Sequence, residues 1–171
     1  MKKLILIVGP SGVGKDTLLK KIRNKIEAHF VTRHITRAPD DSEQNYFVTP
    51  KEFLKLKEQG FFVATWNAHS FDYGIAKDEL QDGANIISVS RSSVGDFEKM
   101  FDDVVTINIT APKEICNQRL HQRNRENEND IKERLLNSSK PICAKNLIQF
   151  SNDLPLELST LKFLELIKGL L

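Results

Sequence analysis

One short stretch near the amino end constrains the fold of this chain more than any other feature. Leu4 to Val8 is a continuous apolar run, which predicts a strand buried on both faces, as in a parallel sheet. Apolar residues at helical spacing follow a glycine-rich turn and predict a helix. Between the two lies a G-x-x-x-x-G-K pattern, in which backbone N–H groups and a helix N-terminus converge on a phosphate. This phosphate-binding loop consists of Gly9, Pro10, Ser11, Gly12, Val13, Gly14, Lys15, Asp16 and Thr17.

Two charged residues of the loop have distinct expected roles. Lys15 is placed to reach the β- and γ-phosphates of a nucleotide. Asp16 stands where such loops normally carry a Ser or Thr that binds magnesium. We expect the Asp16 carboxylate to bind Mg²⁺, with Ser88, Ser90 or water as neutral ligands. The alternative is that Asp16 only favours the start of the helix through the helix dipole.

Composition limits the remaining classes of protein. With 171 residues, the chain is long enough for a sizeable core, and we expect one domain over residues 1–171. A net charge of +2 without a Lys/Arg-rich block gives no electrostatic case for nucleic acid. No stretch is long enough to span a membrane, and the first apolar run is too short for a secretion signal. Cys116 and Cys143 lack zinc spacing and are expected to be reduced, so we expect a cytoplasmic protein.

Strands and helices alternate along the chain, which predicts an α/β fold with a parallel sheet and a ligand crevice at the carboxyl ends of the strands. Core strands are expected at residues 30–33, 85–90, 104–109 and 147–150, and core helices at 15–28, 76–82, 92–101, 112–122, 131–139 and 156–171. Residues 33–76 predict a small inserted α/β unit, with a strand at 46–48, a helix that begins after Thr49 and ends at Gly60, and a hairpin of residues 61–66 and 70–73.

Four arginines surround a charged segment, residues 123–130, that has no apolar periodicity. Beside a phosphate-binding loop, this pattern favours a lid that closes over phosphates and stabilises the charge of the transition state. The alternative is a solvated face on which neighbouring acidic residues neutralise the arginines. The four are Arg119, Arg123, Arg125 and Arg134.

The inserted unit carries a second polar set that suits a phosphorylated ligand, because Arg binds phosphate bidentately and Tyr donates its hydroxyl. Trp66 is expected in the core, and the histidines are expected to form hydrogen bonds rather than act as general bases. The set comprises Arg33, His34, Arg37, Tyr46, Trp66, His69 and Tyr73.

Over nearly its whole length the chain resembles the guanylate kinase group of nucleoside monophosphate kinases. This resemblance implies a P-loop NTPase fold of the nucleoside monophosphate kinase type: a three-layer sandwich with a parallel sheet, a small inserted substrate-binding subdomain and a lid. The matching features are residues 9–15, Thr36-Arg37 with Pro39, Tyr46 to Val48, Glu52-Phe53, Trp66, Tyr73-Gly74, Asn152-Asp153 and the spacing of Arg119, Arg123 and Arg134.

The residues that read guanine in that group are changed here. Thr65 replaces the glutamate that precedes the tryptophan, and Arg33 replaces a serine. Loss of the glutamate removes a charge-assisted partner of the guanine N–H groups. The tyrosine that contacts the acceptor phosphate aligns with Asn45, one place before Tyr46.

A closer similarity is to the ribose 1,5-bisphosphate phosphokinases of phosphonate metabolism. It implies a monomer or homodimer that uses ATP and Mg²⁺ to convert a small phosphorylated substrate, ribose 1,5-bisphosphate, to 5-phosphoribosyl 1-diphosphate. The matching residues are Gly14-Lys15-Asp16, the run from Arg33 to Arg37, Trp66 to His69, Tyr73-Gly74, Ser90-Arg91 and the run from Arg123 to Asn127.

The resemblance also implies roles for individual residues. Lys15, Arg119 and Arg134 are expected at the transferred phosphoryl group, and Arg123 and Asn152 at the adenine. The acceptor is expected to contact Arg33, Arg37, Tyr46, Tyr73 and Arg91. Two alternatives remain: a nucleoside monophosphate kinase with altered base recognition, and a catalytically silent guanylate-kinase-like module that binds protein partners.

Overall fold

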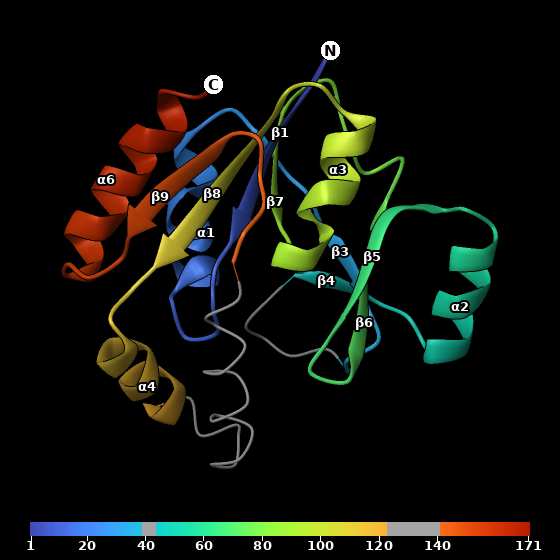
Figure 1. Ribbon diagram of the computed structural model, residues 1–171, viewed down its shortest axis with the longest axis horizontal. Helices are drawn as coiled ribbons and strands as arrows, with labels where there is room; N and C mark the ends of the chain where they lie inside the picture. Colours follow the sequence, from blue (N-terminus) through green and yellow to red (C-terminus); the bar gives the residue numbers. More distant parts are fainter. Residues whose placement is uncertain (39–43, 123–140) are drawn as a thin grey trace.

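A five-stranded parallel sheet forms the centre of the molecule (Figure 1). The computed structural model describes residues 1–38, 44–122 and 141–171. Because all the neighbouring strands of this sheet are parallel, their carboxyl ends meet at one edge. In spatial order the strands are β2 (His29–Phe30), β7 (Gly83–Ser88), β1 (Lys2–Val8), β8 (Val104–Thr110) and β9 (Leu147–Ser151).

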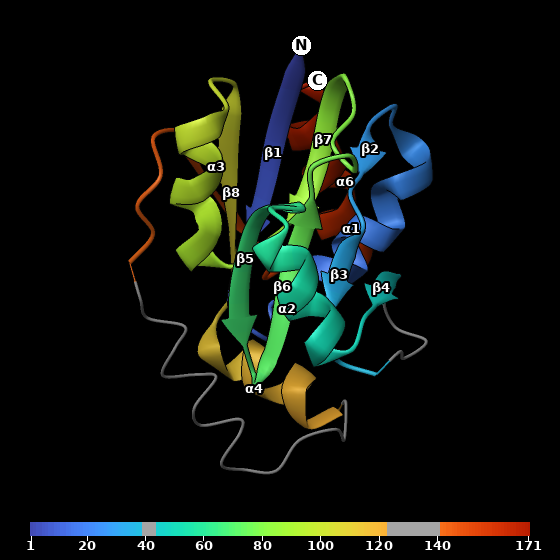
Figure 2. The same cartoon turned by 90° about the vertical axis from the view of Figure 1, so that its right-hand side faces the viewer.

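Layers cover both faces of this sheet, and β1 is buried between them (Figures 1 and 2). Ile5 packs in a cluster with residues of α1 and α6, whereas Leu6 packs in a cluster with residues of α3 and of a second sheet. This alternation confirms the strand predicted from the apolar run. The covering helices are α1 (Lys15–Ile22), α3 (Val94–Met100) and α6 (Leu156–Lys168).

The second sheet lies within residues 33–76 and has four strands in the spatial order β4-β3-β6-β5. Strands β3 and β4 are parallel, and the other neighbours are antiparallel. The four strands are β3 (Arg33–Ile35), β4 (Asn45–Phe47), β5 (Phe62–Ala68) and β6 (Phe71–Ala76).

Helix α2 (Pro50–Glu58) connects β4 to β5 and begins as predicted. The Thr49 hydroxyl accepts from the Glu52 N–H at 3.3 Å, and the Glu52 carboxylate accepts from the Thr49 N–H at 2.8 Å. This capping box satisfies two backbone donors at the helix start. Phe53 is buried, whereas Leu54 is exposed.

Three sequence predictions of local structure are wrong in detail. The first helix ends at Ile22 and continues as a short 3-10 turn, η1 (Arg23–Lys25), rather than reaching residue 28. The strand expected at 30–33 is split, because the chain leaves the central sheet after Phe30 and enters the second sheet at Arg33. The helix expected at 76–82 is absent, since Ala76 still pairs with Phe62 in β5 and a turn follows.

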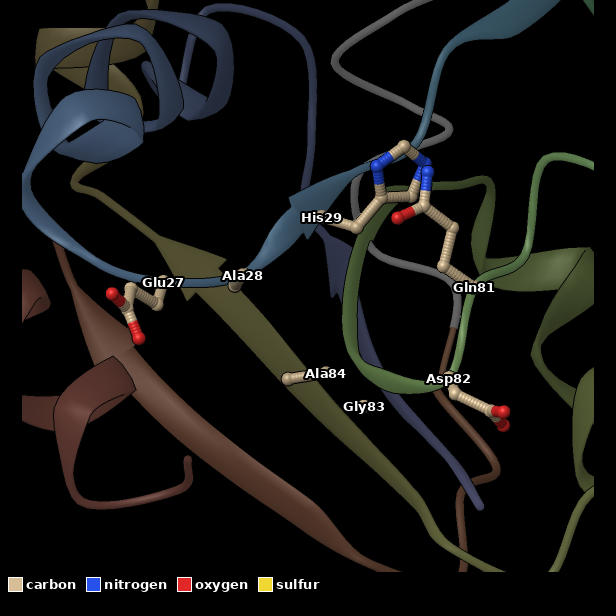
Figure 3. A pocket seen from close by; sticks show the side chains of 7 residues that line it. All are labelled: Glu27, Ala28, His29, Gln81, Asp82, Gly83 and Ala84. Atoms are coloured by element: carbon tan, nitrogen blue, oxygen red, sulfur yellow. The ribbon is translucent and has the colours of Figure 1, made fainter.

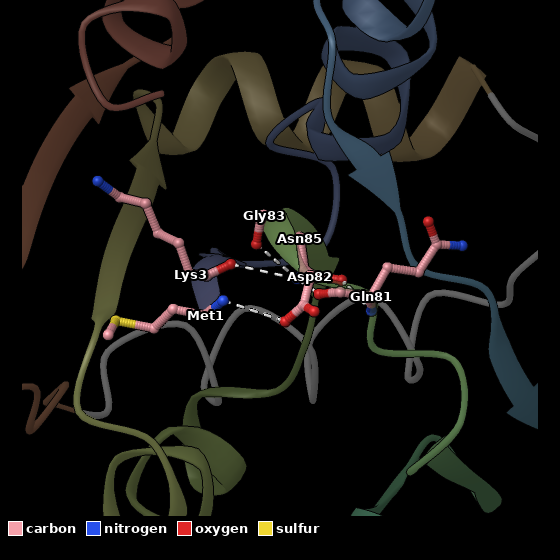
Figure 4. Close-up of polar contacts among 6 residues, drawn as sticks. All are labelled: Met1, Lys3, Gln81, Asp82, Gly83 and Asn85. Atoms are coloured by element: carbon pink, nitrogen blue, oxygen red, sulfur yellow. Dashed lines mark hydrogen bonds and ion pairs between the residues drawn. The ribbon is translucent and has the colours of Figure 1, made fainter.

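The buried side chain of Asn85 holds the bend at Gln81 and Asp82 that leads into β7, where a helix was expected (Figure 4). Its Oδ1 accepts from the Gln81 N–H at 2.9 Å. Its Nδ2 donates to the carbonyls of Gln81 at 2.8 Å, Gly83 at 3.0 Å and Lys3 at 3.4 Å. One amide therefore satisfies the backbone of the turn and joins it to β1.

The other elements match the predicted ones closely. Residues 91–100 form the 3-10 turn η2 (Arg91–Ser93) followed by α3, and α4 (Lys113–Gln122) follows β8. The helix expected at 131–139 lies outside the described residues. Within residues 1–38, 44–122 and 141–171, every helix is too short or too polar to span a bilayer.

We expect Asn85→Ala to lower the free energy of unfolding by about 2 kcal/mol, because it leaves several buried backbone groups without partners. Urea denaturation measures this difference. Asn67→Ala is the matched control: Asn67 is exposed and its amide donates to Asp72 at 3.1 Å, so its loss should cost less than about 0.5 kcal/mol. Equal losses in the two variants would contradict the role given to Asn85.

Candidate active site

The phosphate-binding loop connects β1 to α1 at the carboxyl edge of the central sheet. The Lys15 ammonium donates to the Gly9 carbonyl at 2.9 Å, so its side chain folds back along the loop. Gly14 is the N-cap of α1 with φ of 93°, and a Cβ there would lie 2.6 Å from Asn152 Nδ2. A Cβ on Gly12 would lie 2.8 Å from the Cys116 carbonyl oxygen. Both glycines are therefore required by close approach as well as by backbone conformation.

The Val13 carbonyl is the point at which three segments meet. Arg119 from α4 donates to it at 3.0 Å, and Asn152, directly after β9, donates to it at 2.7 Å. Arg119 also donates to the Asn152 carbonyl at 3.3 Å, and the Asn152 N–H donates to the Thr110 carbonyl at 2.7 Å. These bonds hold the loop against the ends of β8, β9 and α4.

The structure thus brings together three residues that the sequence assigned to the nucleotide site: Lys15, Arg119 and Asn152. Arg119 was expected over the transferred phosphoryl group, but here its guanidinium contacts the loop backbone. Asn152 is buried, and within the described part of the chain its Oδ1 has no hydrogen-bond partner. Arg123, Arg125, Arg134 and the expected lid at 123–130 lie outside the described residues.

Asp16 lies in the first turn of α1, half-buried and next to Lys15. The two serines expected as neutral metal ligands have other contacts: Ser88 Oγ accepts from Arg33 at 3.5 Å, and Ser90 Oγ accepts from the Ser92 N–H at 3.3 Å. Among the described residues, no group of three or more His, Cys, Asp or Glu side chains can hold a metal ion. A carboxylate at this position suits a hard cation that takes its other oxygens from phosphates and water.

A second polar group surrounds Arg33 in β3. Arg33 Nε donates to Asn45 Oδ1 at 3.2 Å, and its NH1 donates to Ser88 Oγ at 3.5 Å. Its Cζ lies 5.6 Å from the centre of the Tyr73 ring. Ser88 is the last residue of β7 and pairs with Ile7, so this group lies next to the strand that leads into the phosphate-binding loop.

Strand alternation separates Tyr46 from this group. Arg33 pairs with Asn45, and His34 pairs with Tyr46, so Asn45 and Tyr46 point to opposite faces of the second sheet. The structure therefore brings Arg33 and Tyr73 together but does not bring Tyr46 to them. Asn45, which aligned with the family tyrosine, takes the position beside Arg33.

Tyr46 instead packs against His34, with ring centres 4.9 Å apart. The charge of Glu79 and a hydrogen bond to it raise the pKa of Tyr46. Burial lowers the pKa of His34, against the opposing charges of Glu79 and Asp78. His34 also lies against the rings of Phe61 and Phe62, with ring centres 5.4 Å and 5.6 Å away. His69 lies in the turn between β5 and β6 with φ of 52°.

Arg37 follows the end of β3 by two residues, and Arg91 lies beyond the end of β7. Arg37 follows Thr36, which is held by two bonds to Asp72: the Thr36 N–H donates to the Asp72 carbonyl at 3.1 Å, and the Thr36 hydroxyl accepts from the Asp72 N–H at 2.9 Å. Arg91 lies three residues after Ser88, at the carboxyl end of β7. Burial lowers the pKa of Arg91, but a guanidinium remains charged at neutral pH.

A shallow hollow of about 350 Å³ lies away from this edge (Figure 3). Residues 27–29 and 81–84, at the amino ends of β2 and β7, line it. None of the candidate active-site residues lines it, so it is separate from the candidate active site.

The fold and the loop define a P-loop kinase. The family model described as guanylate kinase matches residues 1–162, and the chain belongs to that family. A solved guanylate kinase from Anaplasma phagocytophilum has a similar fold, with a TM-score of 0.70 at 20% identity over 98% of this chain and 85% of that one. Kinases of this family use ATP and a divalent metal ion.

Similarity to named relatives places the chain more narrowly within this family. A ribose 1,5-bisphosphate phosphokinase PhnN of Bradyrhizobium diazoefficiens is 35% identical over 84% of this chain and 76% of its own length. A bifunctional ribose 1,5-bisphosphokinase-thymidine phosphorylase of Roseobacter denitrificans is 40% identical over 97% of this chain, which spans only 26% of that relative. Within the guanylate kinase family, the chain therefore belongs with the PhnN kinases.

The two cysteines should differ sharply in reactivity. Cys116 is buried beneath the loop, and burial raises the pKa of its thiol against the opposing charges of Arg119 and Lys15, whereas Cys143 is exposed. Since the thiolate is the reactive form, we expect Ellman's reagent to modify one thiol rapidly near neutral pH and both in guanidinium chloride. A rapid phase that survives in Cys143→Ser would contradict this assignment.

Proposed function

We propose that this chain transfers the γ-phosphoryl group of ATP to a phosphate of ribose 1,5-bisphosphate, giving 5-phosphoribosyl 1-diphosphate and ADP. The observation that carries the proposal is the position of the Arg33 group at the end of β7, beside the strand that leads into the phosphate-binding loop. Kinases named for this substrate, at 35–40% identity, support the choice of acceptor. We further propose that the protein acts in the cytoplasm as a monomer or homodimer; its two free thiols favour a reducing compartment.

The chemistry requires no general base. The attacking oxygen belongs to a phosphate that is already ionised at neutral pH. Its lone pair forms the new bond to the γ-phosphorus, while the bond from that phosphorus to the bridging oxygen breaks and its electron pair leaves with ADP. Catalysis then depends on alignment of the two substrates and on neutralisation of their charge.

We assign the roles as follows. Lys15 leaves Gly9 to bind the β- and γ-phosphates, and Arg119 and Asn152 hold the loop in shape. Arg134 at the phosphoryl group, Arg123 at the adenine and Arg125 in the lid stay predictions from the sequence. For the acceptor we propose Arg33, Arg37 and Arg91 as phosphate ligands, with Asn45 in place of Tyr46.

A divalent ion, which we propose to be Mg²⁺, would supply charge neutralisation between the β- and γ-phosphates. Asp16 would hold it, because an anionic carboxylate so close to bound triphosphate would otherwise be repelled. The contacts of Ser88 and Ser90 favour water over these hydroxyls as the neutral ligands.

A substrate panel tests the proposed function. With ATP and Mg²⁺, we expect faster turnover of ribose 1,5-bisphosphate than of GMP, dGMP or AMP, with 5-phosphoribosyl 1-diphosphate as the product. Lys15→Ala should lower kcat at least about 100-fold, as the loss of other groups that stabilise transition-state charge does. Lys20→Ala, an exposed lysine on the same helix, is the matched control. Faster turnover of GMP would establish a nucleoside monophosphate kinase, and no turnover and no nucleotide binding would establish a silent module.

The metal role of Asp16 has its own test. Asp16→Asn should raise the Mg²⁺ concentration for half-maximal rate about ten-fold, the scale of a disturbed ligand shell. Asp96→Asn makes the same change in the first turn of α3 and should leave the metal dependence unaltered. An unchanged metal dependence in both variants, with normal thermal stability, would leave Asp16 with the helix-start role alone.

A further inference from the structure

Three side chains from adjacent strands form a layered stack in the second sheet. The rings of Trp66 and Tyr73 lie parallel, with centres 5.5 Å apart and planes 6° apart. The guanidinium of Arg33 lies over the Tyr73 ring, with Cζ 5.6 Å from its centre. Trp66 comes from β5, Tyr73 from β6 and Arg33 from β3, so the phenol ring lies between partners from its two neighbouring strands.

The two aromatic rings are buried in the core, whereas the Arg33 guanidinium lies at the edge of the core. Trp66 is 9% exposed and Tyr73 is 7% exposed, and both belong to the core cluster that includes Leu6 of β1. Arg33 is only half-buried. The stack therefore has a rigid aromatic base and ends in a cation that a ligand can reach.

Arg33 is held along its edge as well as on its face. Asn45 accepts from Nε, Ser88 accepts from one terminal nitrogen, and the Tyr73 ring lies against the flat face. A guanidinium restrained in this way has lost most of its rotamer freedom before a ligand binds, so less entropy is lost when it grips a phosphate.

We propose that Tyr73 is a positioning residue that acts through its ring: it orients Arg33 to bind a phosphate of the acceptor, with Trp66 supporting the ring from the other strand. The inference rests on the proposed function for the identity of that acceptor. It differs from the expectation for Tyr73 drawn from the sequence, in which the tyrosine hydroxyl itself binds the phosphate.

Paired substitutions separate the ring from the hydroxyl. Tyr73→Leu should raise the KM for ribose 1,5-bisphosphate about ten-fold, the scale of a partly desolvated cation–π contact, and leave the KM for ATP within about two-fold. Tyr73→Phe keeps the ring and should restore most of the acceptor affinity. Phe53→Leu is the matched control, because Phe53 is also a buried, stacked aromatic residue of this unit, 4.8 Å from the Phe62 ring.

A double-mutant cycle tests whether Tyr73 acts through Arg33. The double variant Arg33→Ala, Tyr73→Leu should bind the acceptor within about two-fold of Arg33→Ala alone, since coupled residues are not additive. If the loss of acceptor affinity in the double variant equals the product of the losses in the two single variants, the proposal is overturned. So would an equal rise in KM for Tyr73→Phe and Tyr73→Leu, which would assign the contact to the hydroxyl, or an equal rise in Phe53→Leu, which would assign it to general destabilisation.

A binding measurement keeps this test separate from the proposed function. Trp66 is the chain's single tryptophan, so its fluorescence reports on the stack itself. If the wild-type protein prefers a different phosphorylated acceptor, the proposed function fails, and the same cycle is run by titrating that acceptor and following Trp66 emission. Loss of affinity in Tyr73→Leu with recovery in Tyr73→Phe would then still support the positioning role, and its absence would overturn it.

Discussion

The shared hydrogen bonding of the Val13 carbonyl is the contact on which the nucleotide half of the structure depends. The glycines of the loop have no side chains with which to hold its shape, so its conformation depends on contacts with neighbouring segments. Here Arg119 and Asn152 converge on one carbonyl oxygen, and the space that a Cβ on Gly14 would need is taken by the Asn152 amide. Helix α4 and the residue that follows strand β9 thus fix the conformation of a loop that is far away in sequence.

The two faces of the second sheet carry different kinds of side chain. The face that carries Arg33, Asn45 and Tyr73 is polar at its margin and joins the core below the phosphate-binding loop. The opposite face is aromatic and packs beneath α2, where His34 lies among Tyr46 and two phenylalanines. Because side chains alternate along a strand, a shift of one residue exchanges these two chemistries completely.

This dependence on register helps to explain how much of the structure could be predicted from the sequence. The loop around Lys15, the strand before it and the cap at Thr49 are encoded in contiguous residues, and all three were predicted correctly. Whether Asn45 or Tyr46 lies beside Arg33 depends on which residue pairs with Arg33 across the two strands. Local sequence patterns do not specify that pairing. The turn before β7 likewise depends on one buried amide, Asn85, whose partners include the backbone of β1. The contacts of Arg119 and Asn152 with Val13 required the positions of α4 and β9, which local patterns do not contain.

The core cluster that holds Leu6 of the central sheet also holds Trp66 and Tyr73 of the second sheet. Packed interiors tolerate changes in side-chain volume poorly, so an altered residue in this cluster would be felt by the strand that carries the phosphate-binding loop. Polar groups at the margin of the cluster, such as Arg33 and Asn45, can be exchanged without repacking it, so a substitution there would change the proposed acceptor site and leave the aromatic core beneath it in place.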